Sequence, residues 1–517
     1  MRPILTAALL AAAALPAQAA ELRFATTSDP TTLDPNAGNS APVHSMLGNV
    51  YEGLVRRGRD MGIEPALATA WEPLAEGHGW RFTLREGVTF HGGEAFTAED
   101  VVFSYERASS PESDTASWFA GVAGVEAVDE RTVDIRLDGP NPIFIDGIAN
   151  WVMMDAGWAA ENDAQRPSIE RGNFATLNTN GTGPYRVTER QPGLRTVFEA
   201  HDGWWGDDRG NVTRAVYTPV TNEATAVAAL LSGELDLVDP VPVQDAARLE
   251  AAPGVEVIRG IEARVIVLGF PHDAEALVAG GEGNPFADPR VRRAVAHAVN
   301  VPAILQTVMR GSAEPATQLI GPGLRGYSDG VEATPHDPEA ARALLAEAGY
   351  PDGFGFSFRC TNDRYLNDEA VCTAIAAMLA QVGLEPALET MPVANYFPAL
   401  RAGEHDLYLL GWSPGTFDAE HPLRFLAATP DEAAQRGSWN FGGYSNARVD
   451  ALIPAIQSET DEAARQAMID EVNAILAREQ AYVPLYVQPL LWGVREGVEV
   501  VQRPDDFIVL RWITVPE

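Results

Sequence analysis

Two hydrophobic patterns alternate along the chain and predict a mixed α/β protein. Residues 22–26 (LRFAT) and 132–137 (TVDIRL) alternate apolar and polar side chains, as strands with one buried face do. Residues 337–353 (DPEAARALLAEAGYPDG) place apolar side chains three and four positions apart, as a helix with one buried face does. Both patterns recur without an internal repeat or a low-complexity linker, which favours α/β layers in lobes that short crossing strands join.

The ends of the expected helices carry residues that suit them. Asp337 can cap the helix just described, and Gly349 can end it. Within 221–238 (TNEATAVAALLSGELDLV) we expect a helix that Thr221 caps and Gly233 stops. A short strand should follow that glycine.

The stretch TFHGGEAFTAEDVVFSY (89–105) gathers a histidine, two glycines and three carboxylates, as an active site can. Its local chemistry favours a structural role. The glycines tolerate a turn, Thr97 can cap a helix, and Asp100 stands at the acidic position of a capping box. Phe96 and Val101 have the spacing of a hydrophobic staple. We therefore expect a turn into a helix rather than a catalytic site.

The first twenty residues (MRPILTAALLAAAALPAQAA) have the pattern of a secretory signal peptide. One basic residue, Arg2, precedes an apolar run over 4–15, and an A-x-A cleavage pattern follows at 17–19. The run is too short and too weakly flanked for a membrane anchor, and no cysteine near the cleavage point supports a lipid anchor. We expect 1–19 to be removed, which leaves an exported, soluble protein.

Length and charge narrow the class of protein. A chain of 517 residues predicts two or more domains, or one large bilobal unit. Asp and Glu number 72 against 37 Lys and Arg, which gives a formal net charge of −35. A field of this sign repels phosphate backbones and anionic membranes, so we expect no nucleic-acid partner.

The two cysteines, Cys360 and Cys372, are twelve positions apart. Two reduced, buried thiols would fit the sequence, but the export signal implies an oxidising compartment, so we expect a local disulfide. Two cysteines do not make a zinc-binding pattern, and the nine histidines lack metal-ligand spacing. We therefore expect no cofactor and no metal.

An exported hydrolase is the main alternative class of protein. Two G-x-S-x-G matches, GYSDG (326–330) and GWSPG (411–415), are weak evidence by themselves. The H-E-x-x-H motif is absent, and S-x-x-K is absent because the chain contains no lysine. A phosphate-binding P-loop is absent too. The sequence favours a binding protein over an enzyme.

Eight blocks in order carry a resemblance to a known family. They resemble segments of the bacterial extracellular solute-binding proteins of the peptide/nickel class, the periplasmic receptors of ABC importers for dipeptides, oligopeptides and related solutes. The blocks are LRFATTSDPTTLDPN (22–36), GNVYEGLVRR (48–57) with IEPALATAWE (63–72), LREGVTFHGGEAFTAEDVVFSYER (84–107), NGTGPYRV (180–187), SGELDLV (232–238), DPRVRRAVAHAVN (288–300), EHDLYLLGW (404–412) and WNFGGYSNARVD (439–450).

The resemblance implies an α/β, bilobal, periplasmic-binding-protein-like fold of type II. Lobe 1 should span 20–265, with an accessory subdomain over about 55–185, and lobe 2 should span 266–488. Residues 489–517 should return to lobe 1. Hinge closure would then enclose a solute without chemistry. The partner would be an inner-membrane ABC permease, and the receptor would act as a periplasmic monomer.

The resemblance also implies ligand-binding residues. Asp418 matches the place where peptide-binding relatives hold the ligand's α-ammonium, although capping its own loop is the structural alternative. Trp412 suits stacking on a ligand or filling the core. Dipeptide-binding relatives have Arg-Pro-Tyr where this chain has Asp363-Arg364-Tyr365. Arg364 is displaced by one position, so it either reads a carboxylate or pairs with Asp363 or Asp368.

Weaker candidates lie on loops that line the cleft in relatives. These are Thr27 and Ser28 near the mature start, and Asn440 and Tyr444 on a glycine-rich loop. Each suits a turn as well as a ligand contact. Because Arg364 is displaced from the position that it has in dipeptide-binding relatives, the resemblance does not predict strict specificity for dipeptides. The non-peptide alternatives are an opine, an oligosaccharide and a metal chelate.

Overall fold

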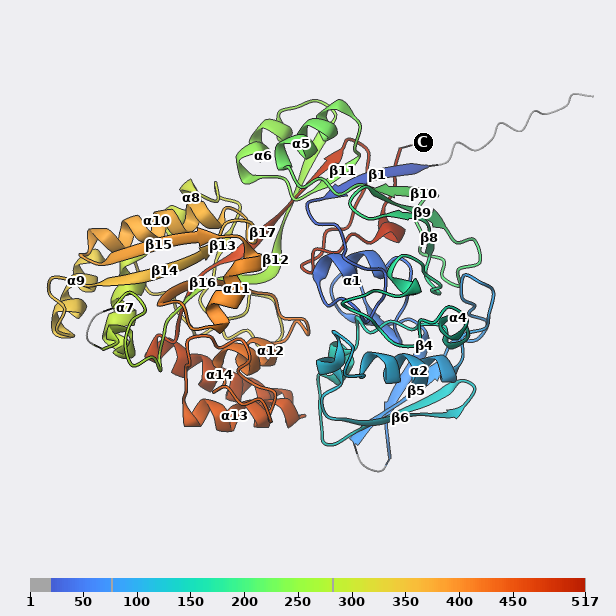
Figure 1. The fold of residues 1–517 in the computed structure, drawn as a ribbon, viewed down its shortest axis with the longest axis horizontal. Coiled ribbons are helices and arrows are strands. Elements are labelled where there is room, and N and C mark those ends of the chain that lie inside the picture. Colours follow the sequence, from blue (N-terminus) through green and yellow to red (C-terminus); the bar gives the residue numbers. More distant parts are fainter. Residues whose placement is uncertain (1–19, 76–77, 281–282, 517) are drawn as a thin grey trace, which may run out of the picture.

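Two lobes make up the computed structural model, which describes residues 20–75, 78–280 and 283–516. Long strands run between the lobes (Figure 1). The expected signal peptide, 1–19, lies outside the described residues. Within the described ranges, no helix combines the length and apolar character needed to span a bilayer.

One sheet of eleven strands extends through both lobes. Its order is β15-β14-β16-β12-β17-β11-β1-β10-β9-β8, with β13 paired to β17. In lobe 1 it contains β1 (Glu21–Thr26), β8 (Tyr185–Gln191), β9 (Arg195–Ala200), β10 (Arg214–Tyr217) and β11 (Leu237–Asp239). In lobe 2 it contains β13 (Glu314–Pro315), β14 (Gly355–Thr361), β15 (Glu385–Met391) and β16 (Leu407–Trp412).

The two lobes are joined by β12 (Val255–Gly269) and β17 (Tyr482–Arg495). Residues 255–261 of β12 pair with 489–495 of β17, and residues 265–269 pair with 482–487. The pairing is irregular between Ile261 and Val265. This irregularity lies where the ribbon passes from one lobe to the other (Figure 1).

Alternation of side chains along the sheet explains the cores. In β12, Ile266 and Leu268 face one core of lobe 2, whereas Val265 and Val267 face the other. The first core is covered by α7 (Pro289–Ala298), α8 (Val301–Thr307), α9 (Pro338–Glu347) and α10 (Asp368–Gln381). The second is covered by α11 (Val393–Arg401), α12 (Glu420–Pro422), α13 (Ala447–Ser458) and α14 (Glu462–Glu479).

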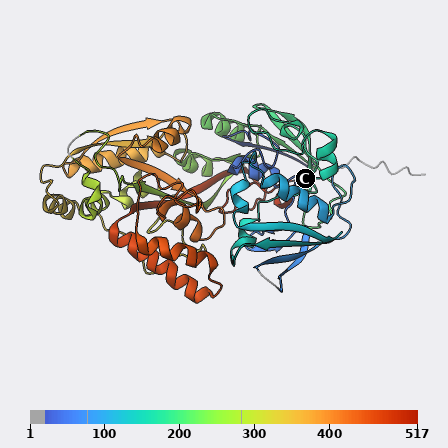
Figure 2. The ribbon, with the colours of Figure 1, turned by 60° about the horizontal axis from the view of Figure 1, so that its bottom comes forward.

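Lobe 1 is covered by helices in the same way. One face of its sheet packs on α1 (Ala41–Leu47), and the other packs on α5 (Glu223–Ser232) and α6 (Val243–Glu250). A second sheet, in the order β4-β5-β7-β6, forms a layer of its own with α2 against it (Figure 2). The remaining elements here are β2 (Val55–Arg57), β3 (Ile63–Pro65), β4 (Ala68–Pro73), β5 (His78–Leu84), α2 (Ala98–Ala108), β6 (Val122–Asp129), β7 (Thr132–Leu137), α3 (Phe144–Gly147) and α4 (Ala156–Glu161).

The glycine-rich stretch at 89–105 forms the expected turn and helix. The Asp100 carboxylate accepts hydrogen bonds from the Thr97 backbone N–H at 2.9 Å and from its hydroxyl at 3.1 Å, which completes a capping box. Phe96 and Val101 are buried in the same core. The structural interpretation of this stretch is therefore confirmed.

The other helix ends agree with the sequence except at one residue. The Asp337 side chain caps α9, and Gly233 ends α5 in the left-handed region at a φ of 79°. Thr221 is not the cap of α5; Asn222 is, because its side chain accepts the Thr225 N–H. A preceding threonine and a following asparagine are both good caps, so the sequence pattern leaves a one-residue ambiguity.

Candidate ligand-binding site

A cavity of about 140 Å³ lies in lobe 1, where the loop after β1, helix α1, the end of β11 and the C-terminal segment meet. The loop after β1 and α1 lie on the side of lobe 1 that faces lobe 2 (Figure 1). Its lining mixes aromatic and aliphatic side chains with a few polar ones: Phe24, Thr26, Thr27, Ser28, Pro30, Ala41, Pro42, Ser45, Met46, Asn49, Phe198, Tyr217, Asp239, Pro240, Asp506 and Ile508. The space suits a small organic group, since it equals roughly ten water positions.

Strand pairing brings the polar residues of this wall together. Parallel pairing of β1 with β11 sets Thr26 beside Asp239. The C-terminal segment adds Asp506, whose carboxylate accepts the Trp492 indole N–H at 2.9 Å. Glu262, at the irregularity of β12, lies near enough to raise the pKa of Asp239, although it does not line the cavity. We call Asp239, Asp506 and Glu262 the hinge carboxylates.

Burial and repulsion between carboxylates raise the pKa values of Asp239 and Asp506. Burial, together with the charge of Glu262, raises the pKa of Asp239 to about 8. The Trp492 indole opposes part of that rise. Burial and the charges of the other two carboxylates raise the pKa of Asp506 well above its usual range. These shifts favour the protonated forms of Asp239 and Asp506 at neutral pH.

Glu262 differs from the other two because it has close partners. Arg264 lies 2.8 Å from one of its oxygens, and the Gln488 side chain donates to the other at 2.6 Å. Gln488 in turn accepts the Leu366 N–H at 3.3 Å. This chain of contacts connects the wall of the cavity to the loop between β14 and α10 in lobe 2.

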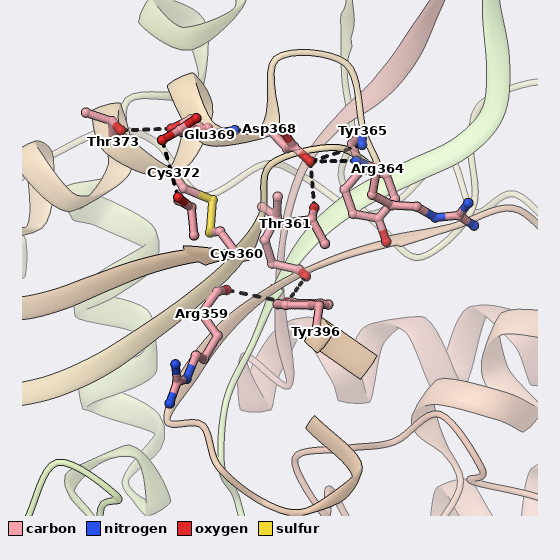
Figure 3. Close-up of a disulfide and its surroundings, with 12 residues drawn as sticks. Arg359, Cys360, Thr361, Arg364, Tyr365, Asp368, Glu369, Cys372, Thr373 and Tyr396 are labelled. Atoms are coloured by element: carbon pink, nitrogen blue, oxygen red, sulfur yellow. Dashed lines mark hydrogen bonds between the residues drawn. A yellow bond between two sulfur atoms is a disulfide. The ribbon is translucent and has the colours of Figure 1, made fainter. Parts of the chain in front are cut away.

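That loop, residues 361–368, is fixed by a carboxylate and lies beside a disulfide (Figure 3). The Asp368 carboxylate accepts the Thr361 hydroxyl at 2.6 Å and the Arg364 N–H at 3.1 Å. Cys360 of β14 and Cys372 of α10 are joined, with their Cα atoms 6.6 Å apart. The expected local disulfide is present, and it ties the strand to the helix on either side of the loop.

The two candidate residues on this loop, Arg364 and Tyr365, differ in their exposure to solvent. Tyr365 is buried, and its hydroxyl donates to the Gly411 carbonyl at 3.4 Å. Arg364 is exposed, and its guanidinium points away from Asp368 (Figure 3). Among the described residues Arg364 forms no ion pair. The Asp363 side chain accepts the Val393 N–H, and the Asp368 carboxylate accepts the backbone N–H groups of Arg364 and Tyr365. The pairing alternative for Arg364 is therefore wrong, and its ligand role stays a prediction.

Asp418 is engaged in a buried ion pair in lobe 2. Arg465 of α14 donates to both of its carboxylate oxygens, at 2.7 and 2.8 Å, and the Glu420 N–H donates to one of them. Asp418 is 1% exposed and does not line the cavity. The residue that the resemblance marks as an amine anchor thus has a guanidinium where a ligand ammonium would be, and its ligand role remains a prediction.

Trp412 and Asn440 also lie away from the cavity. Trp412 is half-buried among His421, Phe425 and Trp439, and its indole N–H donates to His421 at 3.2 Å. The Asn440 side chain exchanges hydrogen bonds with the Tyr444 backbone. Both contacts are structural, and a ligand role for these residues stays untested.

Of the sequence candidates, Ser28 and Thr27 line the cavity with Asp239 and Asp506. The Ser28 carbonyl accepts the Tyr217 hydroxyl at 2.7 Å, which holds the loop against β10. Sequence reasoning missed Asp239 and Asp506. Two features of the sequence could have pointed to them. Asp239 stands at the end of a short strand, and Asp505 and Asp506 are adjacent in a tail expected to return to lobe 1.

The lobes also touch at a place away from the hinge. Arg57 of lobe 1 donates to the Thr416 carbonyl of lobe 2 at 3.0 Å and lies over the Phe417 ring. Asp146 of lobe 1 lies 3.5 Å from Arg57 and 3.9 Å from Arg325 of lobe 2. These contacts hold the two lobes together on the side of α1 away from the hinge strands.

Comparisons with known proteins agree on the family and the fold. The model of the bacterial extracellular solute-binding proteins, family 5, matches residues 62–433. The glutathione-binding protein GsiB of Salmonella typhi is 28% identical over 490 residues, which cover 93% of this chain and 91% of GsiB. GsiB of Escherichia coli O157:H7 is 27% identical over 483 residues, covering 92% and 90%.

Solved structures share the bilobal type II architecture. DppA from Helicobacter pylori, in complex with the peptide STSA, has a TM-score of 0.79 and 23% identity over 96% of this chain and 98% of its own. AgaA from A. tumefaciens R10, in complex with agropinic acid, has a TM-score of 0.78 and 25% identity over 96% and 99%. Since the family model covers well over half of its length, this chain belongs to the bacterial extracellular solute-binding proteins, family 5.

Proposed function

We propose that this protein is the periplasmic solute-binding component of an ABC importer and that it captures short peptides. The observation that carries the proposal is the acid-lined cavity, which lies in the wall of lobe 1 facing lobe 2 and beside the strands that join them. GsiB, which is similar over nearly the whole chain, is a glutathione-binding protein. DppA was solved with a peptide.

Hinge closure is the mechanism that the fold supports. The proposed lobes are 20–265, with an accessory subdomain over about 55–185, and 266–488, with 489–517 returning to lobe 1. Rotation at the irregular segment of β12 would bring the loop 361–368 over the cavity. A solute that contacts both walls binds the closed form better than the open one, and that difference in affinity drives closure. We propose a monomer and no catalytic step.

The charges at the two walls favour a solute with an ammonium and a carboxylate. Lobe 1 offers Asp239 and Asp506 at the cavity, and lobe 2 offers the exposed Arg364 guanidinium. A short peptide has both groups at its ends. An opine is the second candidate, which the similarity to AgaA with agropinic acid supports.

Native mass spectrometry of the purified protein, followed by identification of whatever small molecule is released on denaturation, tests the proposal. We expect a mixture of short peptides, and we expect added short peptides to raise the melting temperature. A single opine would keep the receptor role and overturn the peptide. Cleavage of a peptide by the purified protein would contradict the receptor role and favour the hydrolase.

A further inference from the structure

We propose that Asp239 and Asp506 form a subsite for the positively charged amino group of the solute. This inference rests on the proposed receptor function and names the chemistry that lobe 1 recognises. It places the ammonium in lobe 1, beside the hinge strands, and not at Asp418 in lobe 2. Both carboxylates line the cavity.

Asp239 is a buried carboxylate with little support from donors. It is only 7% exposed, and among the described residues no ion pair and no hydrogen bond within 3.5 Å reaches its carboxylate. The Trp492 indole lies near enough to lower the pKa of Asp239, but its N–H is held by Asp506 at 2.9 Å, and it is the side-chain donor to Asp506 within the described ranges. Buried polar groups are almost always paired, and a buried carboxylate is costly unless a cation or a donor accompanies it. The open lone pairs on the cavity wall therefore point to a missing donor.

The neighbouring cations do not supply that donor. Arg264 is bound to Glu262 at 2.8 Å, and Arg503 is paired with Asp505. The other titratable group that faces Asp239 is the Tyr217 hydroxyl on β10, whose pKa burial raises to about 12. An ammonium that enters the cavity would favour the ionised forms of Asp239 and Asp506 and donate to their oxygens.

The size and lining of the cavity favour an organic ammonium over a metal ion. In the part of the chain that the structure describes, no group of three or more His, Cys, Asp or Glu side chains is arranged to hold a metal. The cavity is wider than one ion, at about 140 Å³, and Phe24, Phe198 and Ile508 give it an apolar floor. That combination fits an amino group with its first aliphatic carbons, and it directs the rest of the solute toward lobe 2.

Matched peptide probes test the subsite in the full mature protein. The probes are the short-peptide fraction of a casein digest and the same fraction after acetylation of its amines. Protection is measured as the rise in melting temperature with probe concentration. Asp239→Asn and Asp506→Asn are compared with Asp202→Asn, a control on an aspartate whose side chain is 98% exposed. Circular dichroism of the empty proteins checks that each variant folds.

We expect the untreated digest to protect the wild type and the acetylated digest to fail. Asp239→Asn and Asp506→Asn should need at least about tenfold more digest for the same protection, because each loses a charge-assisted hydrogen bond. The control should match the wild type. Equal protection by both digests, or wild-type responses from both variants, would overturn the subsite and leave peptide binding intact.

If neither digest protects the wild type, the peptide function fails and the subsite is tested by itself. The probes are then free amino acids, simple amines and an opine. Protection by one of them that both variants lose would support the ammonium subsite. No protection by any amine-bearing probe would overturn it.

Discussion

Asp239→Asn should stabilise the ligand-free protein increasingly as pH rises from about 4 to 8, and should leave it nearly unchanged below about pH 4. The asparagine has the same shape and carries no charge at any pH. In the wild type, the pKa of Asp239 is about 8 in the folded protein, against an ordinary value of 3.8. The folded state therefore holds a proton that the unfolded state releases, so stability is full below about pH 4 and falls as pH rises to 8.

The size of the effect follows from the pKa shift. One pKa unit corresponds to about 1.4 kcal/mol. Between about pH 5 and pH 8 the wild type would lose roughly 4 kcal/mol through this group alone. Asp506 titrates together with Asp239, so we expect the substitution to recover about 2–4 kcal/mol at pH 8.

Chemical denaturation followed by tryptophan fluorescence, at several pH values between 5 and 8, measures the effect. Solute is first removed by unfolding and refolding. Buried histidines such as His272 and His421, whose pKa values burial lowers to about 3, change both proteins equally and cancel in the difference. Asp202→Asn is the control. A difference between variant and wild type that does not change with pH would refute the reasoning.

Three further predictions concern lobe 2. Reduction of Cys360–Cys372 should lower the free energy of unfolding by about 2–3 kcal/mol, since the closed loop is short; free thiols in the unreduced protein, detected by mass labelling, would contradict the disulfide. Arg465→Leu should cost about 3–5 kcal/mol in a urea titration, because it removes the guanidinium that donates to both oxygens of the buried Asp418 and leaves Arg325, 3.8 Å away, as the remaining cation among the described residues. A wild-type midpoint would show that Arg325 is a sufficient partner. Arg364→Ala should weaken binding of peptides with a free carboxyl terminus by about 1.5–3 kcal/mol in calorimetry, and an equal loss for amidated peptides would exclude carboxylate recognition.

Local features of the fold were predictable because neighbouring residues determine them. The Thr97–Asp100 capping box, the Gly233 stop of α5 and the Asp337 cap of α9 each depend on residues within four positions. The disulfide was predictable for a related reason. Cys360 is the next-to-last residue of β14 and Cys372 lies one turn into the following helix, so a short loop brings them together.

The charged contacts were not predictable because they join distant segments. Asp418 meets Arg465 across 47 positions, and no local pattern distinguishes that arginine from others in lobe 2. The hinge carboxylates come from β11, β12 and the C-terminal segment. Only the strand order of the sheet, in which β17 lies between β11 and β12, brings these three segments together.

The hinge carboxylates are costly to bury, and they lie beside the strands about which the lobes would close. Glu262 occupies the segment of β12 where strand pairing is irregular, and Asp506 adopts a left-handed backbone with a φ of 61°. Strained backbone conformations of this kind persist where the surrounding structure imposes them, and they often occur at functional sites. When lobe 2 closes over a bound ammonium, water leaves and the attraction between unlike charges strengthens. The same carboxylates that destabilise the empty wall would then favour the closed form, and they would do so only with a cationic solute inside.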